Sequence, residues 1–91
     1  MEKNLQRDRL AILRCRVDAI DRRIVRLLGL RQRMVAAMKP LKSRLRDPAR
    51  EAEILRFASR QGRRTGADPA FVRKVYEALL AASRSFLRRQ A

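Results

Sequence analysis

A run of apolar residues, spaced alternately three and four positions apart, constrains the fold of this chain more than any other feature. Nine of the ten positions in the run are apolar. The ten positions, which we call the apolar seam, are Leu10, Leu13, Val17, Ile20, Ile24, Leu27, Arg31, Met34, Met38 and Leu41. This spacing is typical of one long helix that packs along its length against other helices.

Arg31 is the charged residue within this seam. A guanidinium on the packed face of a helix costs free energy unless an anion meets it there. Arg14 lies beside the seam toward one end, and Lys42 lies beside it at the other end. Three cations on or near the core-facing side of one helix therefore predict a buried pocket for a small anion.

The expected first helix, from about Leu5 to about Leu41, would be about 55 Å long at the usual rise per residue. Two short helices of a 91-residue chain cannot cover a helix of that length. We therefore expect its far half to pack on a second copy of the chain, which also adds stability to a small core. Pro40 is expected to kink or end the helix. The sequence thus predicts one all-α domain over residues 1–91, assembled as a homodimer.

Two Asp-Pro pairs mark the starts of two further helices. Asp is a favoured N-cap residue and Pro is favoured at the first helical position, so Asp47-Pro48 and Asp68-Pro69 each predict a helix start. The first of these helices is expected to end around Gln61-Gly62, followed by a linker over residues 63–67. The second carries a broad apolar face made of Phe71, Val72, Val75, Tyr76, Leu79, Leu80, Ala82, Phe86 and Leu87, with Ser83 inside it.

The net charge of +15 permits two interpretations. One is a polyanionic partner such as nucleic acid, and the other is an arginine-rich surface with a few functional cations. Basic residues are spread over both halves of the chain, which argues against a dedicated nucleic-acid-binding arm.

Composition excludes several other classes of protein. The chain has no histidine and one cysteine, Cys15, so a histidine-based triad is excluded, a zinc site is disfavoured and no cofactor is expected. No stretch of about 18 apolar residues could span a membrane. The first residues lack the apolar core of a signal peptide, so we expect a cytoplasmic protein.

The order of these features resembles the all-helical, or type II, chorismate mutase family. The resemblance rests on residues 17–28, on Arg14, Arg31 and Lys42, and on the segment 46–55, and it extends over about residues 10 to 87. It implies intertwined homodimers of three-helix chains, in which each active site takes one arginine from the partner. It also implies the rearrangement of chorismate to prephenate, a step of aromatic amino acid biosynthesis in the shikimate pathway.

That reaction suits the residues present. It is a pericyclic shift that needs no nucleophile, base or metal. The enzyme has to hold a dianion in its folded, reactive shape and to stabilise the charge that grows on the breaking ether oxygen. Fixed cations in a dry pocket do both.

The resemblance implies roles for four cations of this sequence. Arg14 would reach across the dimer to a substrate carboxylate, and Arg31 would bind a carboxylate from within the same chain. Lys42 would contact the ether oxygen and a carboxylate. Arg50 would help to close the charged pocket.

It also implies roles for residues of the second and third helices. Asp47 and Glu51 would meet the ring hydroxyl, and Ser83 would lie near the ring carboxylate. One turn after that serine the family usually has Gln or Glu, which helps the lysine to hold the ether oxygen. Here that position is Leu87, which cannot donate a hydrogen bond, and Gln90 lies three residues further on.

Two other features depart from the family pattern. The segment between Lys42 and Asp47 is shorter than usual and follows Pro40 closely, which makes Lys39 a second candidate for the lysine role. The charge of +15 is also unusual. With Leu87, these departures argue against an efficient mutase, although not against the fold.

Other functions remain open on the same residues. An isochorismate-pyruvate lyase shares the basic triad and the Leu28-Gly29 pair, whereas Asp47 with Arg50 and Glu51 favours the mutase. An aminodeoxychorismate mutase is a third possibility on this fold. A non-catalytic basic module that binds nucleic acid, or a mutase fold kept for scaffolding, belongs to a different class.

Overall fold

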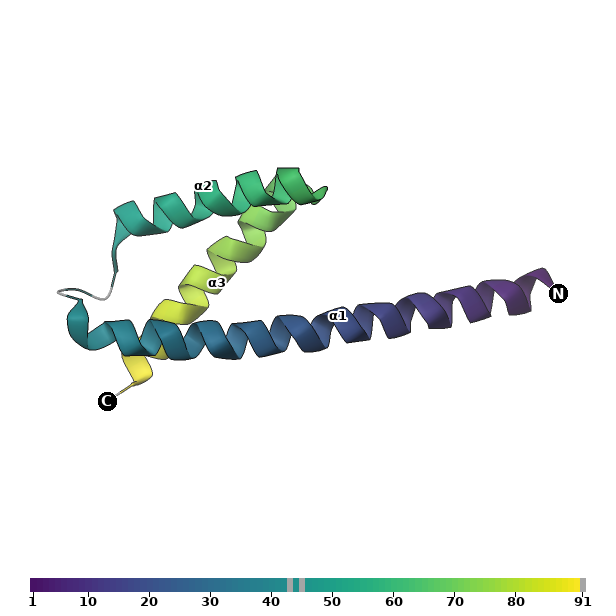
Figure 1. The fold of residues 1–91 in the computed structure, drawn as a ribbon, viewed down its shortest axis with the longest axis horizontal. Helices are drawn as coiled ribbons and strands as arrows, with labels where there is room; N and C mark the ends of the chain where they lie inside the picture. The colour runs from purple at the N-terminus through teal and green to yellow at the C-terminus, as the bar shows by residue number, and fades with distance from the viewer. Residues whose placement is uncertain (43, 45, 91) are drawn as a thin grey trace. The chain divides into compact units, whose positions relative to one another are not determined.

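The computed structural model describes residues 1–42, 44 and 46–90. Over these residues the chain forms three α-helices, α1 (Glu2–Met38), α2 (Pro48–Thr65) and α3 (Pro69–Arg89), and one short 3₁₀-helix, η1 (Lys39–Leu41) (Figure 1). The predicted all-α, three-helix architecture is confirmed. The chain divides into two compact units, Met1–Met34 and Val35–Ala91.

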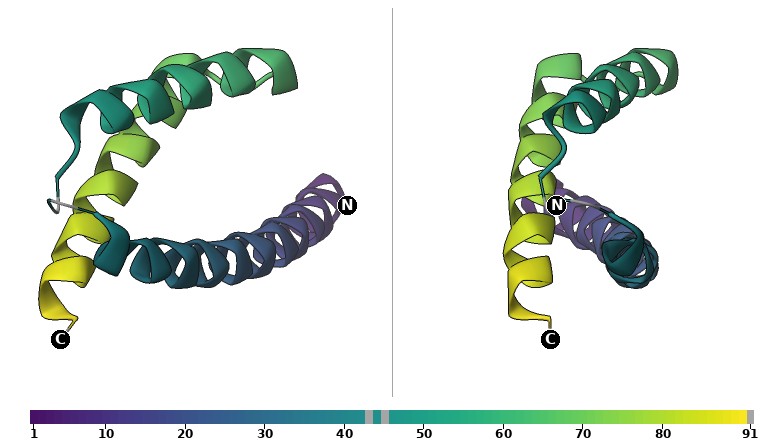
Figure 2. Two further views of the ribbon diagram at one scale, coloured as in Figure 1. Left: turned by 60° about the vertical axis from the view of Figure 1, so that its left-hand side comes forward. Right: turned by 90° about the vertical axis from the view of Figure 1, so that its left-hand side faces the viewer.

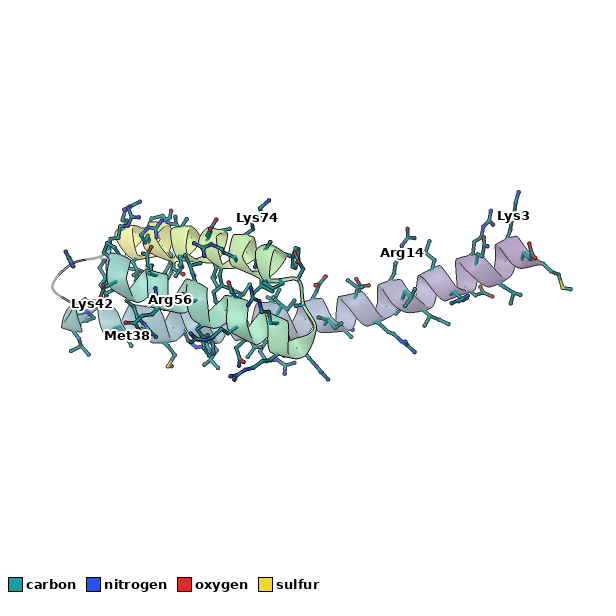
Figure 3. All side chains as sticks on the ribbon, turned by 90° about the horizontal axis from the view of Figure 1, so that it is seen from above. Lys3, Arg14, Met38, Lys42, Arg56 and Lys74 are labelled. Atoms are coloured by element: carbon teal, nitrogen blue, oxygen red, sulfur yellow. The ribbon has the colours of Figure 1, made fainter. Side chains whose placement is uncertain are left out.

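The first unit consists of α1 up to Met34, and its apolar seam is exposed. The apolar seam side chains from Leu10 to Leu27, together with Met34, are 46 to 62% exposed. No residue of α1 is buried. Figure 3 shows side chains leaving this helix all around its axis, with Lys3 and Arg14 labelled. This unit therefore has no core of its own, although the apolar seam runs along it.

α1 ends earlier than the periodicity predicted, and it also begins three residues earlier, at Glu2. The α-helix stops at Met38, and Lys39–Leu41 continue it as a single 3₁₀ turn with proline near its start. Pro40 explains the change, because it has no N–H to donate and its ring clashes with the carbonyl one turn back in an α-helix. The expected end at Leu41 therefore corresponds to the end of η1.

Both Asp-Pro pairs begin helices, as predicted. The side chain of Asp47 accepts a hydrogen bond from the Arg50 backbone N–H at 3.1 Å, and that of Asp68 accepts one from Phe71 N–H at 3.0 Å. Each carboxylate satisfies a backbone donor that has no partner within the helix. Short-range chemistry is thus sufficient to set where α2 and α3 start.

The predicted end of α2 at Gln61-Gly62 is wrong. α2 continues to Thr65 and ends at Gly66, whose φ is +83°. The N–H groups of Gly66 and Ala67 donate to the carbonyls of Arg63 and Gly62, which is the Schellman arrangement for closing a helix. The expected linker over 63–67 is accordingly shorter, because its first three residues are helical.

Gly62 has a packing role instead of a terminating one. It is buried, and a Cβ built there would lie 3.1 Å from Cγ2 of Val72 on α3. The missing side chain lets the two helices approach each other closely near their connection, where Figure 2 shows them meeting.

The core of the second unit lies between α2 and α3. Ala58, Leu80 and Leu87 are its buried apolar residues, with 2 to 7% exposure. Val72, Tyr76, Leu79, Ser83 and Phe86 are half-buried around them. The predicted apolar face of α3 is narrower than expected, because Phe71, Val75 and Ala82 are exposed.

The length and hydropathy of the helices can be compared with what a membrane-spanning helix requires. Among the described residues, no helix combines the length and the apolar character needed to cross a bilayer.

Candidate active site

The four predicted cations lie on α1, directly after η1 and on α2. Arg14 is exposed on α1, and Arg31 is half-buried on the same helix. Lys42 follows η1 directly, and its backbone N–H donates to the Lys39 carbonyl at 3.2 Å (Figure 3). Arg50 lies exposed in the first turn of α2. Arg14 and Arg31 belong to the first compact unit, and Lys42 and Arg50 belong to the second.

The first turn of α2 holds three of the predicted site residues close together. Asp47 caps the helix through the backbone of Arg50, as described above. The Arg50 guanidinium makes an ion pair of 3.1 Å with Glu53, and both side chains are more than half exposed. Exposed pairs of this kind contribute only about 0–1 kcal/mol. An anionic ligand could therefore recruit Arg50 at little cost.

Glu51 makes an ion pair between α2 and α3. Its Oε1 accepts from Nη1 of Arg84 on α3 at 2.6 Å, and the two side chains are 18 and 21% exposed. The pair is part-buried, so water and salt screen it less than they screen an exposed pair. This contact therefore joins the start of α2 to the last turns of α3.

Lys39 forms a second link, between η1 and the end of α3. Its Nζ donates to the carbonyls of Leu87 and Gln90, each at 2.7 Å. The Leu87 carbonyl also accepts from the backbone N–H of the C-cap residue Gln90 at 3.2 Å, and an ammonium at this helix end interacts favourably with the helix dipole. The bonds anchor the residue that precedes Lys42 by three positions. Lys39, the second candidate for the lysine role, thus caps a helix.

Ser83 and Leu87 lie on the inner face of α3, one turn apart. Ser83 is half-buried, and the Leu87 side chain is 2% exposed. Leu87 thus belongs to the core of the second unit. The hydrocarbon side chain gives this position no hydrogen-bond donor.

Arg84 is the residue that sequence reasoning missed. Leu80 precedes it by four positions and Leu87 follows it by three, so all three share one face of α3. The same logic that singled out Arg31, a guanidinium within an apolar face, applies to Arg84. The signal was present in the sequence, but its partner Glu51 lies 33 residues away.

A comparison with family profiles gives a match over residues 13–88 to the family described as chorismate mutase type II. Comparisons with curated proteins and with solved structures gave no significant match. The matched segment runs from the early part of α1 to the last turn of α3 and takes in all eight predicted site residues. The chain therefore belongs to the chorismate mutase type II family.

Proposed function

We propose that the protein is a chorismate mutase, which rearranges chorismate to prephenate within a cationic pocket. The observation that carries this proposal is the family match, because it spans most of the chain and contains every predicted site residue. Within that segment, Arg14, Arg31 and Lys42 keep the order and spacing of the family's basic residues.

The proposed mechanism is electrostatic. Arg14 and Arg31 bind the two substrate carboxylates, which holds the enolpyruvyl group folded over the ring. Lys42 donates to the ether oxygen as its bond to the ring breaks. Donors fixed in advance at the place where charge develops lower the barrier without a reorganisation cost. No proton is transferred, because the pericyclic shift breaks one carbon–oxygen bond and forms one carbon–carbon bond without making or breaking a bond to hydrogen.

Residues of α2 and α3 complete the proposed substrate site. Asp47 and Glu51 meet the ring hydroxyl, and Arg50 leaves its exposed pair with Glu53 to add positive charge. Ser83 lies near the ring carboxylate, and Leu87 forms an apolar part of the wall.

We further propose that the apolar seam of α1 is the interface of an intertwined homodimer. Covering a Leu, Ile or Val side chain completely contributes about 1.5–3 kcal/mol, and the seam has more than six apolar side chains that are about half exposed. A second α1 carries the same seam and can cover it symmetrically. The dimer would bring Arg14 of one chain to the site that contains Arg31 of the other.

Incubation with three substrates tests this function and separates it from its relatives on the fold. The purified protein is given chorismate, isochorismate or aminodeoxychorismate, and the products are separated by chromatography. We expect prephenate from chorismate. Salicylate and pyruvate from isochorismate would identify a lyase instead, as the Leu28-Gly29 pair suggested. Turnover of the amino analogue alone would identify an aminodeoxychorismate mutase, and no product from any of the three would contradict enzymatic activity on these substrates.

A non-catalytic function has one observation in its favour. A hollow between α2 and α3 is lined by four arginines, Arg56, Arg60, Arg63 and Arg73. Such a surface suits a polyanion, and nucleic-acid binding through it would weaken steeply with salt. Binding to a labelled oligonucleotide at two salt concentrations distinguishes this function from the mutase, which needs no polyanion.

The two aspartate caps offer a matched pair of variants. Asp47→Ala and Asp68→Ala are each expected to lower the free energy of unfolding by about 1 kcal/mol, because each removes one N-cap bond. Asp47→Ala alone should also lower kcat/KM, by about tenfold, since it removes a contact to the ring hydroxyl. Thermal melting and initial rates of prephenate formation measure the two effects. Equal kcat/KM for the two variants would reduce Asp47 to a helix cap.

A further inference from the structure

The contact between Arg84 and Glu51 places an unassigned cation beside a predicted site residue. Nη1 of Arg84 lies 2.6 Å from Oε1 of Glu51, and both side chains are largely buried. Two further ion pairs among the described residues of the second unit, Arg50–Glu53 and Arg73–Glu77, have side chains that are more than half exposed. The Arg84 guanidinium is therefore held in the α2–α3 interface, whereas the other arginines of these pairs extend into solvent.

The contact with Glu51 involves one of several donors on this guanidinium. Arginine has five N–H donors in a rigid, planar fork, and the bond to Glu51 uses one of them. The fixed geometry means that Glu51 also sets the direction of the remaining donors. Glu51 thus acts on the orientation of Arg84 as well as neutralising part of its charge.

Arg84 lies on α3 next to Leu87, whose side chain has no hydrogen-bond donor. Residues three apart on a helix are neighbours on its surface, so Arg84 lies beside Leu87 and directly follows Ser83. Leu87 is buried and apolar, and its backbone carbonyl is taken by Lys39. Arg84 therefore carries a strong hydrogen-bond donor within reach of the region that Leu87 leaves without one.

We propose that Arg84 contacts the substrate and supplies to its ether oxygen the hydrogen-bond donor that Leu87 cannot provide, with Glu51 as the residue that positions it. This inference rests on the proposed mutase function. As the ether bond breaks and the new carbon–carbon bond forms, negative charge grows on that oxygen. A guanidinium fixed beside it stabilises the transition state more than the bound substrate. The isomerisation remains balanced, because Arg84 donates a hydrogen bond and keeps its proton.

Steady-state kinetics of Arg84→Ala, Arg84→Met and Arg84→Lys test the proposal, with Arg88→Ala as the control on an exposed part of the same helix. Arg84→Ala and Arg84→Met should lower kcat by about 10²–10³-fold with a smaller change in KM, because the lost contact strengthens in the transition state. Arg84→Lys should retain part of kcat, since it keeps the charge without the planar fork. Arg88→Ala should match the wild type.

Two further measurements separate substrate contact from a structural ion pair. Added guanidinium ion should restore part of the kcat of Arg84→Ala and leave Arg88→Ala unaffected, which a purely structural arginine would not show. Arg84→Met keeps the apolar stem and guards against loss of the fold. If Arg84→Met is as active as the wild type and only its melting temperature falls, the inference is overturned while the mutase function stands. A wild-type protein that makes no prephenate overturns the function itself, and the role of Arg84 with it.

Discussion

Replacing Arg31 with alanine is expected to lower kcat/KM for chorismate by about 10²–10³-fold while the helical fold is retained. The proposed reason is that Arg31 fixes a substrate carboxylate, so its loss removes both binding and alignment of the folded substrate. The fold should survive because Arg31 is only half-buried on α1, and alanine favours the helix. Initial rates measure kcat/KM, and circular dichroism and thermal melting of the same sample measure whether the fold is retained.

Two companion variants sharpen this result. Arg22→Ala removes an exposed arginine from the same helix and should leave kcat/KM within about twofold, because distant surface charges are screened at moderate salt. Arg31→Lys keeps the charge but loses bidentate geometry, so an intermediate rate is expected. If Arg31→Ala turns over chorismate like the wild type, the assignment of Arg31 to the pocket is wrong.

Helix starts were predictable because their chemistry is local. At Asp47-Pro48 and Asp68-Pro69, the capping carboxylate and the N–H that it accepts from lie three residues apart in each case. No knowledge of the rest of the fold is needed to recognise such a pair. The departure from the α-helix near Pro40 is local in the same sense, because the proline acts on the carbonyl of the preceding turn, although α1 itself ends at Met38 and not at the expected Leu41.

The end of α2 was not predictable in the same way. Gly62 and Gly66 are both compatible with a helix C-terminus, and local preference does not choose between them. The choice depends on α3, because Val72 packs against the bare backbone at Gly62. Helical continuation through Gly62 thus reflects a tertiary contact that the periodicity of α2 does not contain.

The contacts of the candidate site residues also divide into local ones, which were predictable, and long-range ones, which were not. Asp47 was assigned as a cap from its neighbours, and the structure confirms that bond. The partners of Glu51 and Lys39 lie 33 to 51 residues away, on α3 and at its C-cap. These pairs depend on the register between helices, which one sequence does not specify. Sequence reasoning therefore named Glu51 as a site residue without identifying Arg84, the residue that it holds.

Mixing two inactive variants is expected to restore activity, and this result has the largest consequence for the proposed assembly. In the proposed dimer each site takes Arg14 from one chain and Arg31 from the other. Arg14→Ala and Arg31→Ala homodimers then lack one arginine in every site. A mixed dimer of the two has one complete site and one site that lacks both. Random exchange makes about half of the dimers mixed, so about a quarter of wild-type turnover should return.

The matched control for this recovery is a mixture of Arg31→Ala with Lys42→Ala. Both residues are proposed to serve the site of their own chain, so a mixed dimer of these variants has no complete site and should remain inactive. Each pair is unfolded together, refolded at equal concentrations and assayed for prephenate beside its parents. Recovery in the first mixture alone would require Arg14 to act across the interface. Recovery in neither, with wild-type protein refolding to full activity, would mean that Arg14 and Arg31 do not come from different chains in one site. The exposed apolar seam of α1 would then have to be covered by something other than an intertwined copy of the chain.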